Sequence, residues 1–506
     1  MIAEPAPPLR RRTVDVALEA RVRRWTIEEH DARVTLVESA TVSGGEPVPA
    51  EIASDRIRVS YGGHMRVAVL AGGSVDLEHV LRRAVLASGA ELVLLLRADD
   101  ARSFVEHAAA LRDVRPDLVL AVVADRGEAD GIVDLVEALR LGCADHTPAP
   151  RLVVAGEPRA ALRVKAAAAG FAVELLPDPR RPDGIRTFAH RGRELRRGTD
   201  GSVVLRDEAL EELARLVAAG GKDTLVIDVD GGSTSLVRAG VDGTVIAAHV
   251  SSLGAGVAAD RTVGRAGLDG VRRWIPWAID APTLLERVFN RARWPGAVAA
   301  EASALALEIA LAHEATSHAL ADAAAAGMAE TLRDAPITIV TGAAASFTRA
   351  AHTALVAIDG LGSPRPTTLH RDAEEGLVAL GALAARVRAQ GGDPSDAVGD
   401  ELARRLVPIA FVVPVTPGRR SRLRVNGVEH LADDLAPGAF FSVRHRGEAD
   451  VEVTGTPVKA HGTAGELGII VDARGRPLVL PPRDAERIPT LVRWFAALDL
   501  AVANAG

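Results

Sequence analysis

The chain has very little cysteine: Cys143 is the only one in 506 residues. A single cysteine excludes an internal disulfide and any zinc site built from several thiolates, so a reducing compartment is the simplest expectation. No apolar run approaches the ~18 residues that a membrane span requires. The first residues carry prolines and charges where a signal peptide needs an apolar segment. We therefore expect a soluble, cytoplasmic protein that does not act at a membrane.

Runs of like charge are also missing. The net charge of −7 is spread along the whole sequence, and lysine occurs only at Lys165, Lys222 and Lys459. This pattern excludes a basic arm for nucleic acid and a basic patch for anionic membranes. Apolar residues make up 48% of the chain, which is ample for packed cores, and the length predicts roughly two to four domains.

Residues 64–185 alternate continuous apolar segments with amphipathic ones. RVAVLAGG, ELVLLL, DLVLAVVA and RLVVAG are expected strands, and the segments between them have helical periodicity. Strands that are apolar throughout are typical of a parallel sheet covered on both faces, so we expect a Rossmann-like domain. Gly72 and Gly73 follow the first strand without the complete G-x-G-x-x-G spacing, which favours a plain strand-to-helix turn over a dinucleotide site.

The remaining chain divides into three parts. Residues 1–63 have no clear period and are expected to form an N-terminal region, with a degenerate first actin-like lobe as one alternative. Residues 186–390 contain two strands that end in small residues, with a helical insert at 299–333 between them. Residues 391–506 alternate short strands with Gly and Pro turns, which predicts a small C-terminal β-rich domain.

One stretch carries the strongest chemical signal. LVIDVDGGSTSLV, residues 225–237, is an apolar strand that breaks into acids, glycines and hydroxyl residues. Converging backbone amides in such a turn form an anion-binding nest, and glycine lets a phosphate approach them. Ser233 and Thr234 supply further donors, and Asp228 is a candidate ligand for Mg²⁺. The alternative is an ordinary turn without a ligand, because Asp, Gly and Ser are common turn residues.

Residues 228–236, DVDGGSTSL, resemble the second phosphate loop of the actin, sugar kinase and Hsp70 superfamily. IVTGAAASF at 339–347 is similar to the adenosine loop of that superfamily. The resemblance implies an α/β chain that combines an actin-like (RNase H-like) ATPase fold with the Rossmann-like domain and the β-rich domain. It also implies ATP and Mg²⁺ as cofactors. The nucleotide-binding residues that it implies are Asp228, Asp230, Gly231, Gly232, Ser233, Thr234, Thr341, Gly342 and Ala343.

A closer resemblance is to the accessory protein (MutL) family of adenosylcobalamin-dependent glutamate mutase. It rests on RPDLVLAVVADRGEADGIVDLVEALR, SSLGAGVAADRTVGRAGLDG, TALVAIDGLGSPRPTTLHRDAEEGLVALGALA and GELGIIVDARGRPLVLP, and covers residues 64–506. It implies ATP-dependent protection or reactivation of a cobalamin-dependent mutase, which would be the partner.

The sequence departs from these patterns at several places. The first phosphate loop is not visible, and the segment 13–21 offers Asp15 in its place but no glycine. Asp230 and Ala343 stand where glycines are typical, while Gly264 and Ala266 replace acids. These departures predict a degenerate nucleotide site with weak ATPase activity at most.

Two alternatives remain open. An exopolyphosphatase or guanosine-pentaphosphatase is the first, because its phosphate loop is the closest local match to residues 228–236, although a first loop and a catalytic Glu are not found. The second is an actin-like scaffold that binds no nucleotide.

Overall fold

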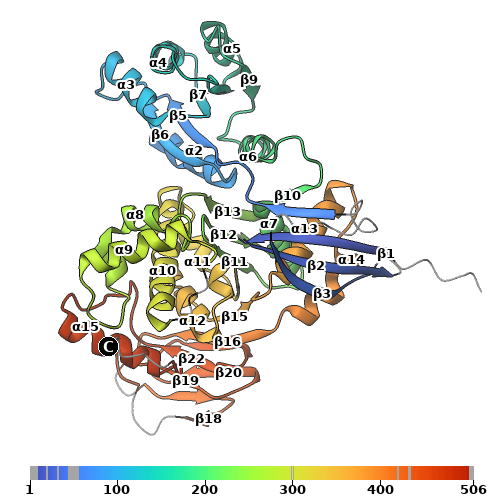
Figure 1. Ribbon diagram of the computed structural model, residues 1–506, viewed down its shortest axis with the longest axis vertical. Helices are drawn as coiled ribbons and strands as arrows, with labels where there is room; N and C mark the ends of the chain where they lie inside the picture. Colours follow the sequence, from blue (N-terminus) through green and yellow to red (C-terminus); the bar gives the residue numbers. More distant parts are fainter. Residues whose placement is uncertain are drawn as a thin grey trace, which may run out of the picture.

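The computed structural model describes residues 10–18, 21–30, 33–43, 56–73, 75–297, 299, 301–418, 421–430 and 435–500. One domain stands apart at one end of the molecule, and a larger α/β body with a C-terminal β unit forms the rest (Figure 1). Among the described residues, no helix combines the length and apolarity needed to cross a membrane.

The domain at the end is Rossmann-like. Its five strands are parallel and lie in the order β6-β5-β7-β8-β9, which is the doubly wound order 2-1-3-4-5. β7 is buried at every position, as expected for a strand covered on both faces. The strands are β5 (Arg66–Ala71), β6 (Glu91–Arg97), β7 (Leu118–Val123), β8 (Arg151–Gly156) and β9 (Val173–Leu176). The helices are α2 (Val75–Ala87), α3 (Phe104–Val114), α4 (Ala129–Gly142), α5 (Pro158–Ala167) and α6 (Pro182–Arg197).

The N-terminal region forms a five-stranded sheet in the order β10-β4-β1-β2-β3. β1, β2 and β3 are an antiparallel meander, and β4 and β10 continue the sheet in parallel with β1. The strands are β1 (Arg10–Leu18), β2 (Arg21–His30), β3 (Arg33–Ser43), β4 (Arg56–Ser60) and β10 (Val203–Leu205). Because β10 follows the Rossmann-like domain in the chain, that domain is inserted between the last two strands of this sheet.

The second sheet begins with the same arrangement. Its order is β13-β12-β11-β14-β15-β16-β22-β19, and its first five strands are again an antiparallel meander followed by two parallel strands. These are β11 (Thr224–Val229), β12 (Thr234–Ala239), β13 (Val245–Val250), β14 (Ile337–Thr341) and β15 (Thr367–Arg371). The mixed α/β class predicted from the sequence is confirmed, with two sheets of like topology beside a parallel Rossmann-like sheet.

The C-terminal strands divide between two sheets. β16 (Pro408–Pro414), β19 (Phe440–Val443) and β22 (Ile469–Asp472) extend the eight-stranded sheet, and β17 (Leu423–Val425), β18 (Val428–Glu429), β20 (Gly447–Val453) and β21 (Lys459–Ala464) form a separate small one. The β-rich character was predicted. The pairing of β16 with β15 was not predicted, and it makes this region continuous with the second sheet.

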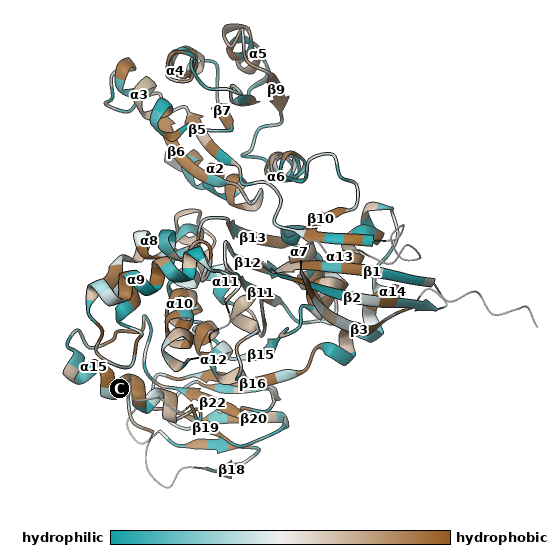
Figure 2. Cartoon of the chain, in the orientation of Figure 1, coloured by the Kyte–Doolittle hydropathy of each residue, from teal (hydrophilic) through white to brown (hydrophobic). Residues whose placement is uncertain are grey.

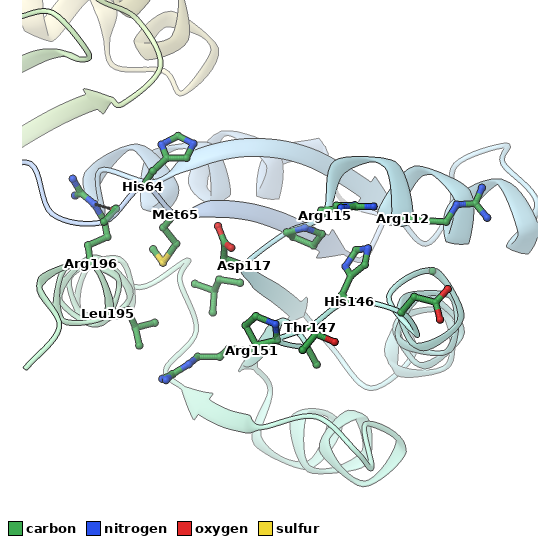
Figure 3. A pocket seen from close by; sticks show the side chains of 17 residues that line it. His64, Met65, Arg112, Arg115, Asp117, His146, Thr147, Arg151, Leu195 and Arg196 are labelled. Carbon is green, nitrogen blue, oxygen red and sulfur yellow. Dashed lines mark hydrogen bonds between the residues drawn. The ribbon is translucent and has the colours of Figure 1, made fainter. Parts of the chain in front are cut away.

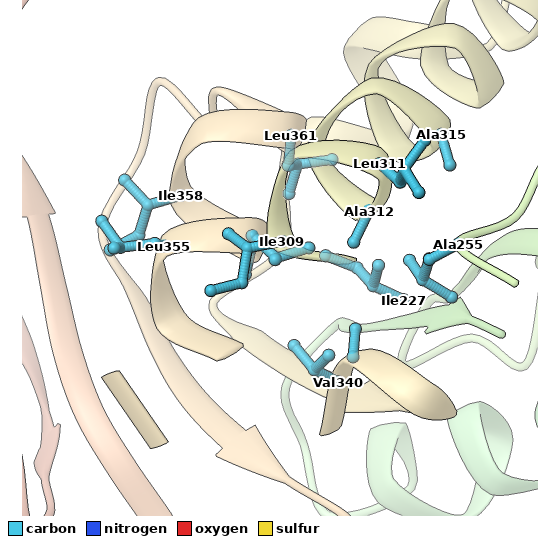
Figure 4. Packing of buried hydrophobic residues seen from close by; sticks show 14 of the residues in the cluster. Ile227, Ala255, Ile309, Leu311, Ala312, Ala315, Val340, Leu355, Ile358 and Leu361 are labelled. Atoms are coloured by element: carbon cyan, nitrogen blue, oxygen red, sulfur yellow. The ribbon is translucent and has the colours of Figure 1, made fainter. Parts of the chain in front are cut away.

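Helices cover both faces of the second sheet. On one face, a cluster of buried apolar residues joins β11 and β14 to the helical insert (Figure 4). Along β4, hydrophobic residues, which are buried, alternate with hydrophilic residues, which are half-buried (Figure 2). The helices are α7 (Arg206–Ala218), α8 (Ala259–Arg272), α9 (Ala281–Arg293), α10 (Ala302–Ala325), α11 (Ala329–Arg333), α12 (Ala350–Leu355), the π-helical turn Val356–Leu361, α13 (Gly376–Ala389), α14 (Ser395–Arg405) and α15 (Asp484–Ala496).

The opposite face packs on α7 and α13, which also cover the first sheet. One cluster contains Val16 of the first sheet, Leu213 of α7, Leu380 of α13 and Val226 of the second sheet. The two helices approach closely at Gly381, where an added Cβ would lie 2.2 Å from the carbonyl oxygen of Ala209. The first and second sheets therefore share one hydrophobic core through α7 and α13.

We expect Gly381→Ala to lower the free energy of unfolding by ~1–3 kcal/mol, because the new methyl group overpacks the contact between α7 and α13. Urea denaturation measures this. Gly399→Ala on α14 is the matched control, since its Cβ meets no atom within 4 Å, and replacing an open helical glycine stabilises by up to ~1 kcal/mol. Equal effects of the two substitutions would contradict the shared core.

Candidate functional site

The glycine turn lies between β11 and β12, as the sequence predicts. The Asp230 amide donates to the carbonyl of Ser233 at 3.0 Å and closes the turn. The Gly231 carbonyl accepts from Gly256 (3.0 Å) and Ala258 (2.9 Å), and the Asp230 carbonyl accepts from Ala255. The segment after β13 is thus hydrogen-bonded to the backbone carbonyl groups of the turn.

The amide side of the turn is different. Within the part of the chain that the structure describes, the backbone amides of Gly231, Gly232 and Ser233 donate to no protein acceptor. Gly231 is buried, Gly232 and Ser233 are half-buried, and successive backbone amides without a protein acceptor are a feature of an anion-binding nest. The structure therefore retains the property that made this turn a candidate phosphate site.

A cavity of about 270 Å³ adjoins this amide side. It lies between the turn, the end of β13 and the segment that connects β4 to the Rossmann-like domain. Its polar lining includes the side chains of Ser233, Ser235, His249 and Ser251, together with Arg196 and Asp207. The remaining lining residues are Tyr61, Gly62, Gly63, His64, Gly89, Asp230, Gly232, Val250 and Val257.

The carboxylate of Asp228 is held by a buried guanidinium. Arg206, the first residue of α7, donates from Nε to Oδ2 of Asp228 at 2.9 Å and from Nη2 to Oδ1 at 2.7 Å. The same Nη2 lies 2.7 Å from Oε2 of Glu375. Arg206 and Asp228 are 1% exposed and Glu375 is fully buried. One cation therefore serves two buried carboxylates at the centre of the molecule.

The charge balance around Arg206 shifts the pKa values of its neighbours. Burial raises the pKa of Glu375 to about 8 against the opposing effect of Arg206, and the carboxylates of Asp372, Asp228 and Asp230 raise it further. Burial also raises the pKa of Asp372 to about 6, although hydrogen bonds from the backbone amides of Val378, Leu377 and Gly376 oppose the shift. The pKa of Arg206 is raised because Asp228 and Glu375 outweigh its desolvation.

The predicted adenosine corner lies beside Asp228. Thr341 Oγ1 donates to Oδ1 of Asp228 at 2.6 Å, and the Gly342 amide donates to Oε1 of Glu375 at 2.9 Å. Gly342 has φ of 78°, and a Cβ there would lie 2.6 Å from the Val229 carbonyl, so only glycine fits. Ala343 begins a short 3-10 turn. The structure thus brings Thr341 and Gly342 next to Asp228, but the groups that contact them are protein side chains.

A magnesium ion at Asp228 was predicted, and the described residues do not fit one while Arg206 stays in place. Both carboxylate oxygens accept hydrogen bonds from Arg206, and Thr341 adds another. The guanidinium already supplies the positive charge that a cation would bring. Among the described residues, no group of three or more His, Cys, Asp or Glu side chains is arranged to hold a metal.

The other sequence candidates have structural partners. Asp15 of β1, considered for the missing first phosphate loop, is buried and pairs with Arg24 at 2.9 Å and with Arg56. Thr234 donates its hydroxyl to the Leu253 carbonyl at 3.0 Å. Asp372 accepts from the Val378 amide at the start of α13, which is the role of a helix cap.

The sequence analysis missed Arg206 and Glu375. Arg206 stands in the charged segment LRDEALEELAR, which has the pattern of an ordinary amphipathic helix start, and no local signal sets this arginine apart. Glu375 has φ of 60°, a left-handed conformation that is unusual for glutamate. Only pairing across 169 residues reveals their role.

A larger cavity lies in the Rossmann-like domain. It has a volume of about 760 Å³ and lies at the amino-terminal ends of β5, β7 and β8, with Arg112, Arg115 and His146 around it (Figure 3). Doubly wound sheets bind ligands at the opposite, carboxyl edge. At that edge the carboxyl group of Glu128 packs on Gly72, where a Cβ would lie 2.1 Å away. The Gly72–Gly73 turn therefore encloses a side chain of the protein, as expected for a plain turn.

The sequence matches no protein-family model and no curated protein. Among solved structures, the chain is similar to a Ppx/GppA family member from Aquifex aeolicus, with 10% identity over 76% of this chain and 92% of that one, at a TM-score of 0.20. An exopolyphosphatase from Cytophaga hutchinsonii covers 56% of this chain and 61% of its own, with 8% identity and a TM-score of 0.17. Acetone carboxylase in its nucleotide-free form covers 91% of this chain and 83% of its own, with 12% identity and a TM-score of 0.30. Similarity at this level does not transfer an activity.

We expect Arg206→Met to lower the free energy of unfolding by ~3–5 kcal/mol, because it leaves the carboxylate of Asp228 buried without its cation and removes the hydrogen bond to Glu375. Arg33→Met is the control. It removes an ion pair with Asp400 in which both side chains are 73% exposed, which is worth at most ~1 kcal/mol. Urea denaturation compares the two, and an Arg206→Met effect no larger than the control would show that the buried cluster does not carry charge.

The same cluster predicts a pH dependence. Asp372 and Glu375 have folded-state pKa values of about 6 and about 8, both above their ordinary values. When the pH lies between the ordinary pKa of such a carboxyl group and its folded-state pKa, the folded chain keeps a proton that the unfolded chain has lost. Raising the pH therefore favours unfolding. We expect the free energy of unfolding to fall as the pH rises from about 5 to about 8, and Glu375→Gln to flatten this slope. Denaturation at a series of pH values measures it; a rising free energy would be the contrary result.

Proposed function

We propose that this chain binds a phosphate-containing ligand, such as a nucleotide or a short phosphoanhydride chain, in the cavity beside the turn at 230–233. The backbone amides of Gly231, Gly232 and Ser233 support this proposal, because they have no protein acceptor among the described residues. Gly232 and Ser233 line the cavity. Side-chain hydroxyls of Ser233, Ser235 and Ser251 add donors for phosphate oxygens.

The proposed ligand binds without a metal ion on Asp228. Arg206 neutralises that carboxylate from the protein side, which reduces the repulsion between Asp228 and an arriving anion. Arg196 lines the cavity itself and is paired with Asp207. The predicted participation of ATP remains part of this proposal, whereas Mg²⁺ is not needed to complete the site.

The position of the cavity suggests what binding accomplishes. Tyr61, Gly62 and Gly63 belong to the connection between β4 and the Rossmann-like domain, and Arg196 comes from the end of α6, just before the chain returns. Arg196 donates to the carbonyl of Ser88 at 2.9 Å and to that of Gly63 at 3.3 Å. A ligand that contacts both the turn and this junction stabilises one arrangement of the domain over others.

A ligand-controlled domain arrangement is what an accessory protein needs. The sequence resemblance to the glutamate mutase accessory family supports a cobalamin-dependent mutase as the partner, and this remains a proposal.

The second candidate is a phosphohydrolase that acts on phosphoanhydrides or phosphate esters. A specific observation favours it: Ser235 and His249, which line the cavity, are hydrogen-bonded at 2.9 Å. The Ppx/GppA and exopolyphosphatase structures have names of this class, but their TM-scores are too low to support the candidate.

We expect ATP and inorganic polyphosphate to raise the melting temperature of the full chain, because a ligand at a hundred times its Kd adds about 2.7 kcal/mol to the folded state. The shift should persist in EDTA. Ser233→Asp should abolish it, because the new carboxylate repels phosphate at the amide nest. Thr199→Asp, in an exposed turn that does not line the cavity, is the matched control and should keep the shift.

The contrary outcomes are distinct. No shift with either compound would support a scaffold that binds no phosphate ligand. A shift that disappears in EDTA would place a metal ion in the site. Capture of a purified cobalamin-dependent mutase that differs with and without ATP would support the accessory role, and release of inorganic phosphate would support the hydrolase.

A further inference from the structure

Three buried polar residues line up on one side of the cavity. Ser235 on β12 and His249 on β13 are register partners across the two strands, with Ser235 Oγ 2.9 Å from Nδ1 of His249. On the other side of the ring, Nε2 lies 3.5 Å from Oε1 of Glu211 on α7. The exposed fractions are 3%, 2% and 7%, so all three are shielded from bulk water.

Glu211 is suited to orient the imidazole. Burial of Glu211 opposes its ionisation, but the charge of Arg193 outweighs this effect and lowers the pKa of Glu211 to about 2. Arg193 holds the carboxylate through a direct ion pair. An ionised carboxylate beside Nε2 favours the tautomer with the proton on Nε2, which leaves Nδ1 as an acceptor for the Ser235 hydroxyl.

Asp207 is the second carboxylate near the ring, with Oδ1 3.8 Å from Nδ1. It is tied to Arg196 by an ion pair, which neutralises its charge. Ser235 and His249 thus form a hydrogen-bonded hydroxyl–imidazole pair, and the Glu211 carboxylate lies 3.5 Å from the other nitrogen of the ring without a hydrogen bond to it.

The donors for a developing negative charge are in the same cavity. Ser235 comes two residues after the turn, and Gly232 and Ser233 line the cavity together with Ser235 and His249. Backbone amides near a nucleophile stabilise charge that develops on the attacked group. Nucleophile, base, orienting acid and anion donors thus meet at one cavity, which is the arrangement expected of a catalytic centre.

We propose that Ser235 is the nucleophile of a phosphoryl-transfer reaction in this cavity, with His249 as its base and Glu211 as the positioning residue. The inference rests on the proposed binding of a phosphate-containing ligand. Ser235 Oγ attacks phosphorus, and its proton passes to Nδ1 of His249. The bond from phosphorus to the leaving oxygen breaks, and His249 returns the proton to that oxygen. Water then attacks the phosphoserine with His249 as base, which releases inorganic phosphate and restores the Ser235 hydroxyl.

The alternative is that the three residues form a buried polar link that ties β12 and β13 to α7. Substitutions would then change stability but not turnover. The two interpretations differ in whether a covalent adduct forms, so the experiment looks for it.

The test uses the full chain with p-nitrophenyl phosphate as the probe. We expect release of p-nitrophenol and, after an acid quench, an added mass of one phosphoryl group on the peptide that contains Ser235. Ser235→Ala should abolish the adduct and lower kcat by at least ~100-fold, and Glu211→Gln should lower kcat while KM stays unchanged, because it acts through His249. Ser442→Ala on β19, outside the cavity, is the control and should keep full activity.

Melting temperatures establish that each variant is folded. Turnover by Ser235→Ala at the rate of the unsubstituted chain would overturn the inference, and so would a chain that gives neither product nor adduct. If ATP and polyphosphate still raise the melting temperature in that case, the binding proposal stands and only the nucleophile is wrong. If they do not, both fail together.

Discussion

The buried guanidinium of Arg206 is the interaction on which the centre of this molecule depends. It meets Asp228 at the end of β11 and Glu375 at the start of α13, while Glu375 also accepts the Gly342 amide from the end of β14. Three segments of the second lobe therefore converge on one arginine, which is supplied by α7, the helix that follows the last strand of the first sheet. Its Nη1 also approaches the Ala17 carbonyl of β1 at 3.4 Å. Buried charges persist only when they are paired in this way, so the cluster fixes how the two lobes meet.

This arrangement changes the meaning of the phosphate-loop pattern. A carboxylate at a strand end followed by glycines suggests a metal-assisted phosphate site, and the carboxylate is indeed at the strand end. Its charge is satisfied by the protein, however, and the cavity lined by Gly232 and Ser233 lies at the junction with the Rossmann-like domain. The proposed ligand site is thus displaced from Asp228 to this cavity, which Ser235 and His249 also line.

Much of the local structure was predictable because it depends on short-range patterns. The apolar runs and glycine stops of residues 64–185 predicted the parallel domain, and residues 299–333 were predicted as helix and form α10 and α11. The turn after β11 was also predicted, since Asp, Gly and Ser are turn formers in any context. The N-terminal sheet was not predicted. Its β1 pairs with a strand from residues 56–60, and its last strand comes from residues 203–205, beyond an entire inserted domain.

The sequence by itself determined the strands and helices of residues 64–185, the glycine turn and the resemblance of that turn to a phosphate loop, because hydrophobic periodicity and turn chemistry are local properties. The tertiary structure alone decided which charged groups became neighbours. Arg206, Glu375 and Glu211 look like ordinary surface residues in the sequence, because they stand in charged segments. Arg206, Glu375 and Glu211 acquire their shifted pKa values only when strands and helices from distant segments remove them from water and place charged groups beside them.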